Sequence, residues 1–247
     1  MFKNLFNKNK QVMTEVAEVE TEVYSTQGDV VEIETQEVEI ETQKVEAQKV
    51  EAQEVEAQED LDPDYLFNAS EIVGWSSIEE QNILFDALIS QYDISNSILD
   101  VGCGRADLYG FLQNKYPGEY INYKGIDYNP NILNIATQKY PNVVVETLDV
   151  LSLDDKADSD WVVASGLFNL NDKDDLGTYT SNCIDKMYEK CKIGIAFNLN
   201  TGKADDDNTM LLSWNASEWL GYLISKYSKV ICKADYLQTD VTFFIFK

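Results

Sequence analysis

Strand and helix patterns alternate through the second part of this chain, and this alternation limits the fold more than any other feature. Short runs rich in β-branched and aromatic residues predict strands at residues 98–101, 123–127, 143–146, 161–164, 193–198, 230–234 and 242–246. Amphipathic runs predict intervening helices at residues 108–115, 132–139, 178–190 and 217–227. This order predicts an α/β fold, in which a mainly parallel sheet carries helices on both faces.

The two ends of this region add detail to the expected fold. Residues 235–241 are too few for a helical crossover, so the last two strands must pair antiparallel or lie apart in the sheet. Before the first strand, Ser76 and Glu79 stand three residues apart, the spacing of a capping box, which predicts a helix start. The expected apolar positions of this helix are Ile78, Ile83, Leu84, Phe85, Leu88 and Ile89.

Residues 1–60 differ in composition from the rest of the chain. A segment Val31-Glu-Ile-Glu-Thr-Gln36 recurs unchanged at residues 38–43, and a five-residue repeat begins at Lys44. The apolar residues of these repeats are mostly Val and Ala, and a period of five places them on no single face of a helix or strand. We therefore expect a disordered acidic tail at 1–60 and one folded domain at 61–247.

The first ten residues stand out within this tail. Phe2, Leu5 and Phe6 share one helical face and are surrounded by lysines. Residues 1–10 are interpreted either as a docking peptide for a partner or a membrane surface, or as a frayed terminus. If they dock, the acidic repeats act as a tether.

The charge of the chain argues against a nucleic-acid substrate. The formal net charge is −25, of which residues 1–60 contribute −11 and residues 61–247 contribute −14. Binding a phosphate backbone requires Lys and Arg to displace counterions, and the sequence contains no basic stripe. We therefore expect a partner other than nucleic acid.

Histidine is absent, and this removes the commonest general base from any mechanism. The four cysteines form no C-x-x-C pair, so we expect no zinc site. Acidic clusters near residues 172–175 and 205–207 are interpreted as solvated loops rather than a cation site. With no signal peptide and no apolar run long enough to span a bilayer, we expect a cytoplasmic location.

The first predicted strand runs into a short glycine-containing segment, Asp100-Val-Gly-Cys-Gly104. Glycines at a strand–helix turn let a ligand approach the backbone, and ligands of parallel sheets bind at the carboxyl ends of the strands. Asp127 ends the second strand, where a carboxylate can accept both hydroxyls of a ribose. Asp149 follows the third strand at the same edge. Cys103 is interpreted as a small buried residue rather than a nucleophile.

These segments together resemble the class I S-adenosylmethionine (SAM)-dependent methyltransferases. Asp100–Gly104 resembles their first motif, Gly125-Ile-Asp-Tyr128 the acidic motif that holds the ribose, and 158–170 the fourth motif, which borders the transferred methyl group. Asp149 matches the position that contacts the adenine amino group. The resemblance implies a Rossmann-like sheet of order 3-2-1-4-5-7-6 with strand 7 antiparallel, and SAM as cofactor.

The resemblance also implies a set of site residues. Those expected to bind the cofactor are Trp75, Asp100, Gly102, Cys103, Gly104, Asp127, Tyr128, Asp149, Val150 and Ser165. Those expected to contact the substrate are Asn169 and Asn198. The chain departs from the family at Ala106, where the first motif has its third glycine, which serves close helix–strand packing.

A sub-family of uncharacterised bacterial and phage methyltransferases is nearer still. It has a Gly-Trp-x-Ser-x-x-x-Gln segment, seen here partly as Gly74 to Gln81, where Trp75 and Gln81 are interpreted either as parts of a cofactor lid or as a core aromatic and a solvated residue. It also has Ser-Gly-hydrophobic-Phe-Asn, seen here as Ser165 to Asn169, and Phe-Asn-Leu, seen at Phe197 to Leu199. The fourth motif thus lacks the Asn/Asp-Pro-Pro-aromatic signature of nucleic-acid amino methylation.

These features together predict SAM-dependent methyl transfer to a small-molecule or protein acceptor, with no assigned general base. The alternatives are a methyltransferase-fold interaction or structural protein tethered by its tail, with a phage particle as one setting, and a SAM-binding regulator without turnover. A phage origin would place the protein in the host cytoplasm or the virion.

Overall fold

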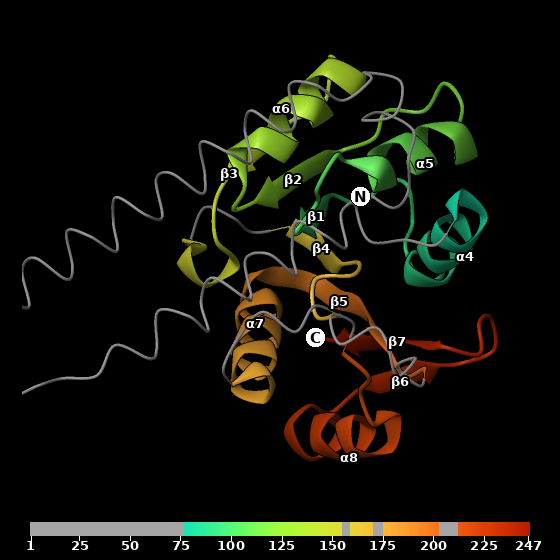
Figure 1. The fold of residues 1–247 in the computed structure, drawn as a ribbon, viewed down its shortest axis with the longest axis vertical. Helices are drawn as coiled ribbons and strands as arrows, with labels where there is room; N and C mark the ends of the chain where they lie inside the picture. The colour runs from blue at the N-terminus through green and yellow to red at the C-terminus, as the bar shows by residue number, and fades with distance from the viewer. Residues whose placement is uncertain (1–76, 155–158, 170–174, 203–211) are drawn as a thin grey trace, which may run out of the picture. The chain divides into compact units, whose positions relative to one another are not determined.

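The computed structural model describes residues 77–154, 159–169, 175–202 and 212–247 (Figure 1). The acidic repeats, the predicted docking peptide at 1–10 and the predicted lid residue Trp75 lie outside the described residues. The expected boundary between residues 60 and 61 lies outside them too, so the two-part organisation stays a prediction.

Strands and helices alternate in the described residues as the sequence predicts. The elements are α4 Ile78–Leu88, β1 Ile98–Val101, α5 Asp107–Lys115, β2 Tyr123–Asp127, α6 Pro130–Lys139, β3 Val145–Thr147, the 3-10 helix η3 Val150–Ser152, β4 Ser159–Ala164, α7 Leu176–Lys190, β5 Cys191–Asn200, α8 Ala216–Lys226, β6 Val230–Lys233 and β7 Asp240–Phe246. Every predicted strand and helix is confirmed, with ends that differ by a few residues at most. The short helix η3 was not predicted.

The strands form a seven-stranded sheet of order β3-β2-β1-β4-β5-β7-β6. Strands β1 to β5 pair in parallel, whereas β7 runs antiparallel to both β5 and β6. The sheet order implied by the resemblance is therefore confirmed. The antiparallel end follows from the short β6–β7 connection, which leaves no room for a helical crossover.

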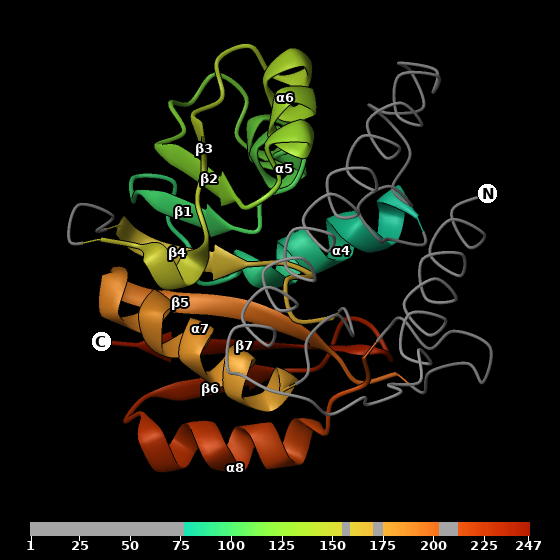
Figure 2. The ribbon, with the colours of Figure 1, turned by 60° about the vertical axis from the view of Figure 1, so that its left-hand side comes forward.

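The helices cover both faces of the sheet (Figure 2). Helices α4, α5 and α6 pack on one face, where their apolar residues meet Ile98, Trp161 and Phe244 of the strands. Helices α7 and α8 pack on the other face against Val162, Phe197 and Phe243. In the described part of the chain, no helix has the length and apolar character needed to cross a membrane.

Helix α4 begins one residue later than the capping pattern predicted. Ser77, not Ser76, is the N-cap, and its hydroxyl accepts a hydrogen bond from the Glu80 amide (3.1 Å). Ser77 and Glu80 have the same three-residue spacing as Ser76 and Glu79, so the pattern fitted both registers. The interpretation of Gln81 as a solvated residue is also wrong, because Gln81 is buried and its amide donates to Asp107 (3.4 Å).

Gly125, in the middle of β2, allows the loop after β1 to approach β2 closely. A Cβ atom built on Gly125 would lie 2.6 Å from Cys103 Sγ and 3.0 Å from the Tyr123 hydroxyl. Side chains at such distances must move apart, and overpacking of this kind strains a core. The glycine therefore lets the loop after β1 lie flat on β2.

We expect Gly125→Ala to lower the free energy of unfolding by about 1–3 kcal/mol, the usual cost of overpacking. Gly221→Ala is the matched control, because Gly221 lies inside α8 and, apart from the helix backbone and the adjacent residues, nothing lies within 4 Å of the position that the new methyl group would take. This control should raise stability by about 0.5–1 kcal/mol. Urea unfolding followed by circular dichroism measures both. Equal effects of the two variants would contradict the close packing at Gly125.

Candidate functional site

The loop after β1 is fixed to β2 by three backbone amides. Gly102 and Cys103 both donate to the Ile126 carbonyl (2.8 and 2.9 Å), and Gly104 donates to Asp127 Oδ2 (3.0 Å). Gly102 and Gly104 have positive φ angles of 70° and 52°, a region that favours glycine. The loop is thus held in one shape at the carboxyl end of the sheet.

Asp127 occupies the end of β2, as predicted, and is half-buried. Its two oxygens accept from the Gly104 amide and from the Asn129 amide (2.9 Å). Burial raises the pKa of Asp127, and these backbone donors counteract the shift. Each carboxylate oxygen keeps a second lone pair, so the group can still accept from a ligand. Tyr128, next in the chain, has 70% of its surface exposed.

Asp100 lies at the start of the same loop but is directed into the protein. It is 3% exposed, and its Oδ2 accepts from the Tyr123 hydroxyl at 2.7 Å. Burial raises the pKa of Asp100 to about 7, and the nearby charges of Asp127 and Asp107 add to the effect, while the Tyr123 hydrogen bond counteracts it. Asp100 therefore changes its charge close to neutral pH.

Cys103 is buried, with its sulfur against Gly125. Burial raises the pKa of its thiol well above the usual range, so the nucleophilic thiolate is disfavoured. This arrangement fits the interpretation of Cys103 as a small buried residue. Any contribution of Cys103 to a cofactor site would come from its backbone.

Asp149 and Val150 lie together beyond β3, at the start of η3. The Asp149 carboxylate accepts from the Leu151 amide (2.7 Å), which caps the short helix, and its side chain is exposed. Val150 is buried in the core. The third acidic residue thus sits after the strand next to β2, as the sequence predicted.

Ala106 has a second role beyond the close packing that the sequence suggested. It is the N-cap of α5, is fully buried, and adopts the left-handed conformation with φ 58° and ψ 36°. The third position of the first motif therefore requires a positive φ angle, in addition to close packing. Alanine can adopt this conformation at a cost of about 1–2 kcal/mol.

Ser165, Asn169 and Asn198 meet where β4 and β5 end. Asn198 Oδ1 accepts from the Gly166 amide (3.0 Å), and Asn169 Oδ1 accepts from the Asn200 amide (3.0 Å). Within the described part of the chain, Ser165 Oγ and Asn198 Nδ2 are buried without a hydrogen-bond partner. The two asparagines fix the β4–α7 loop on β5, and two polar atoms remain for a ligand.

Comparisons with known proteins agree with this geometry. Residues 98–188 match the sequence model of a family described as a methyltransferase domain. Similar solved structures include an amino pentose methyltransferase from Micromonospora echinaspora with SAM bound (13% identity, TM-score 0.51, covering 70% of this chain and 92% of that chain). The fold is that of the class I methyltransferases.

Two further structures of this fold match at similar levels. The magnesium protoporphyrin IX methyltransferase from Synechocystis PCC 6803, solved with SAM, has 13% identity and a TM-score of 0.50, covering 76% of this chain and 98% of that chain. A structure described as a possible exported protein from Bordetella parapertussis has 14% identity and a TM-score of 0.53, covering 68% of this chain and 67% of that chain. A search of curated protein sequences finds no match to this chain.

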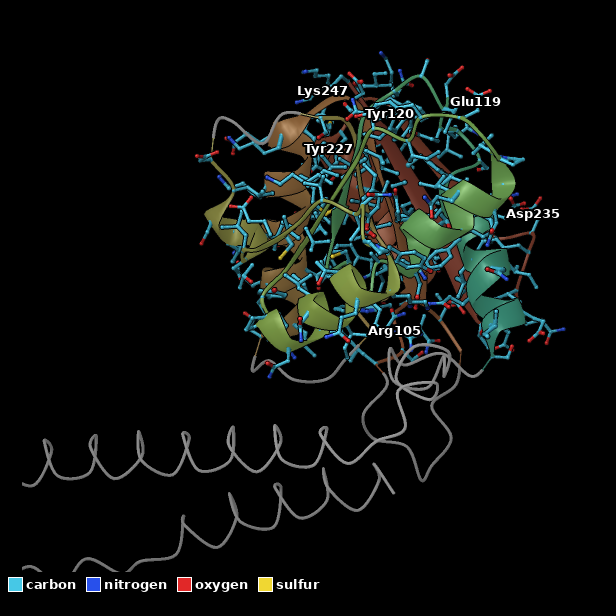
Figure 3. The ribbon with its side chains drawn as sticks, turned by 90° about the horizontal axis from the view of Figure 1, so that it is seen from above. Arg105, Glu119, Tyr120, Tyr227, Asp235 and Lys247 are labelled. Carbon is cyan, nitrogen blue, oxygen red and sulfur yellow. The ribbon has the colours of Figure 1, made fainter. Side chains whose placement is uncertain are left out.

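Sequence reasoning missed a charged group beside the glycine-containing loop after β1. Arg105, at one end of the domain in Figure 3, is 2% exposed and pairs with Asp107 at 2.7 Å. Asp107 also pairs with Lys139 of α6 (2.7 Å) and accepts from Gln81 of α4. Asp107 therefore connects three helices to the loop. The sequence feature that could have predicted a role for Asp107 is its position in the first turn of α5, where an acidic residue is favoured.

The buried Asp100 should make stability depend on pH. Its folded pKa is raised to about 7, so between about pH 4 and about pH 7 the folded protein holds a proton that the unfolded chain releases. The free energy of unfolding that Asp100 contributes therefore falls as the pH rises through that window, by about 1.4 kcal/mol for each unit of pH.

Asp100→Asn, which keeps an acceptor for Tyr123, should remove this dependence. The stability of the native protein relative to this variant should decrease by a few kcal/mol from acid to neutral pH, as measured by urea unfolding across the pH range. Glu119→Gln, which changes an exposed carboxylate, is the control and should leave the profile unchanged. A difference that stays constant with pH would contradict the proposed state of Asp100.

Proposed function

We propose that this protein transfers a methyl group from SAM to a small-molecule or protein acceptor. The observation that carries this proposal is the joint arrangement of the glycine loop and Asp127, in which the Gly104 amide is bonded to a carboxylate that can still accept from a ligand. The methyltransferase domain match over residues 98–188 supports the same activity. The solved methyltransferases of this fold that contain SAM support it as the cofactor.

In this proposal Asp127 accepts the ribose hydroxyls of SAM, and Asp149 and Val150 border the adenine. The backbone of residues 102–104 and the side chain of Ser165 border the methionine part, whereas Asp100 supports the start of the loop from inside the protein through Tyr123. Tyr128 is assigned to the rim of the site, and the role of Trp75 as a cofactor-binding residue stays a prediction from the sequence. When bound, SAM supplies an electrophilic methyl group on a sulfonium.

The residues of this chain mainly have to align the donor and the acceptor and exclude water. Asn198 is the stronger candidate for acceptor contact, because its Nδ2 is buried without a partner. Asn169 uses its Oδ1 to hold the Asn200 amide, so its proposed contribution is to position the loop. No histidine can act as a base, and no other residue is assigned to that role.

The alternative of a tethered interaction protein gains no support from the described residues. The segment on which it depends, residues 1–60, lies outside them. The nearer resemblance to bacterial and phage proteins, the cytoplasmic location and the docking of residues 1–10 stay predictions. Cofactor binding without turnover remains the competing role for the same site.

SAM binding measured by isothermal titration calorimetry tests the proposal. Asp127→Asn should weaken binding by about 10-fold to 100-fold, because hydrogen bonds to a charged group contribute about 1.5–3 kcal/mol. Glu146→Gln is the control, since Glu146 is an exposed carboxylate on the neighbouring β3 that pairs with Lys124 outside the site. The absence of heat with both SAM and S-adenosylhomocysteine would refute the proposed function.

A further inference from the structure

A row of polar side chains lies on one face of the sheet where β5 and β7 pair. Asn198 is opposite Thr242, and Asn200 is opposite Asp240. Because side chains alternate along a strand, these residues share the face of Ala196 and Phe244, which pack in the core cluster formed with α4 and α5. The row therefore begins where the apolar core ends, close to the loop that carries Ser165.

Most polar atoms of this row have partners within the protein. The Asn200 Oδ1 atom accepts from the Gly202 amide (2.8 Å), and the Thr242 hydroxyl is hydrogen-bonded to Tyr236 (2.8 Å). The Nδ2 atom of Asn198 is the exception: the residue is 1% exposed, and among the described residues this donor has no partner of normal hydrogen-bond geometry. Ser165 Oγ, in the loop whose Gly166 amide donates to Asn198, is also buried without a partner there. Leaving a buried polar group unpaired costs about 1–3 kcal/mol, so such atoms are candidates for contact with a ligand.

Asp240 supplies a negative charge at the same place. It is 8% exposed, and its Oδ2 accepts from the Thr239 hydroxyl (2.8 Å). Burial raises the pKa of Asp240, and the charge of Glu80 on α4 raises it further. The Thr239 hydroxyl and a hydrogen-bonding contact with the Asn198 amide counteract this shift, although the Asn198 contact falls short of normal hydrogen-bond geometry. Among the ion pairs of the described residues, none includes Asp240.

We propose that Asp240, Asn198 and Ser165 form a subsite that binds the amino group of the methyl acceptor. The inference rests on the proposed function and deepens it by naming the class of acceptor, an amine. A buried carboxylate beside a second carboxylate favours a cationic or donor-rich group, because a buried charge without a partner is costly. The Asn198 amide and the Ser165 hydroxyl then bind an oxygen of the same acceptor. Asp240 is a substrate-binding residue in this assignment.

Asp240 could instead be only a structural residue that holds the start of β7 through Thr239. In that case the site does not favour an amine over other groups. A structural role predicts loss of stability when the carboxylate is replaced. The proposed role predicts the reverse for the free protein, because Asp240→Asn removes a buried charge without changing the shape of the side chain. Active-site residues commonly lower stability in this way.

The test uses the full chain saturated with S-adenosylhomocysteine and three probes of similar shape: 2-phenylethylamine, 2-phenylethanol and 3-phenylpropionate. Their dissociation constants are measured by NMR from the side-chain amide signal of Asn198, which is assigned by its loss in Asn198→Ser. The native protein should bind the amine at least about 10-fold more tightly than the alcohol, and the carboxylate most weakly. Asp240→Asn should reduce the amine preference to less than about threefold and raise the urea midpoint.

Asp235→Asn is the matched control, because Asp235 is an exposed carboxylate on the same β6–β7 hairpin, paired with Lys233. It should leave the amine preference and the urea midpoint unchanged. An equal affinity for amine and alcohol, no binding of any probe, or an amine preference that survives Asp240→Asn would overturn the subsite. Calorimetry with S-adenosylhomocysteine on the same samples separates the two ideas: lost cofactor binding refutes the proposed function, whereas cofactor binding without amine preference refutes only this inference.

Discussion

The hydrogen bond from the Gly104 amide to the Asp127 carboxylate joins the two strands on which the site depends. It fixes the loop after β1 against the end of β2, and the two amides that donate to the Ile126 carbonyl complete the attachment. Gly125 makes this possible by leaving room for Cys103 beneath the loop. The same contact shapes the loop backbone and orients the carboxylate that faces the proposed cofactor. A change in either strand therefore affects the fold and the site together.

Buried and half-buried carboxylates recur at the carboxyl edge of the sheet. Asp100, Asp127 and Asp240 all have pKa values raised by burial, so each is held in surroundings that disfavour its charge. Such an arrangement lowers the stability of the free protein and favours a ligand with positive charge or hydrogen-bond donors. SAM carries a sulfonium cation, and an amine acceptor is a second cationic ligand. The electrostatics of the edge thus fit both parts of the proposed reaction.

Much of this fold could be predicted from the sequence because its signals are local. The alternation of strands and helices, the glycines after β1 and the short β6–β7 connection each depend on a few neighbouring residues. The sheet order came from the resemblance, since the pattern alone allowed several orders. The start of α4 was wrong by one residue because two Ser–Glu pairs have the same spacing.

The rest of the site depends on contacts between distant segments. Nothing in the sequence around Ala106 shows that its φ angle is positive, and only the packed loop defines it. The interpretation of Gln81 stayed open between a solvated residue and part of a cofactor lid, because its partner, Asp107, is 26 positions away in the chain. Asp240 is likewise missed, since its burial and its place opposite Asn200 follow from the pairing of β5 with β7.

A crystal structure of the protein with S-adenosylhomocysteine tests the central claim most directly. The account predicts electron density for the adenosine at the carboxyl ends of β1 and β2, with both ribose hydroxyls on Asp127 and the adenine beside Asp149. Density for the ligand at another place, or a site that stays empty at saturating ligand, would contradict it.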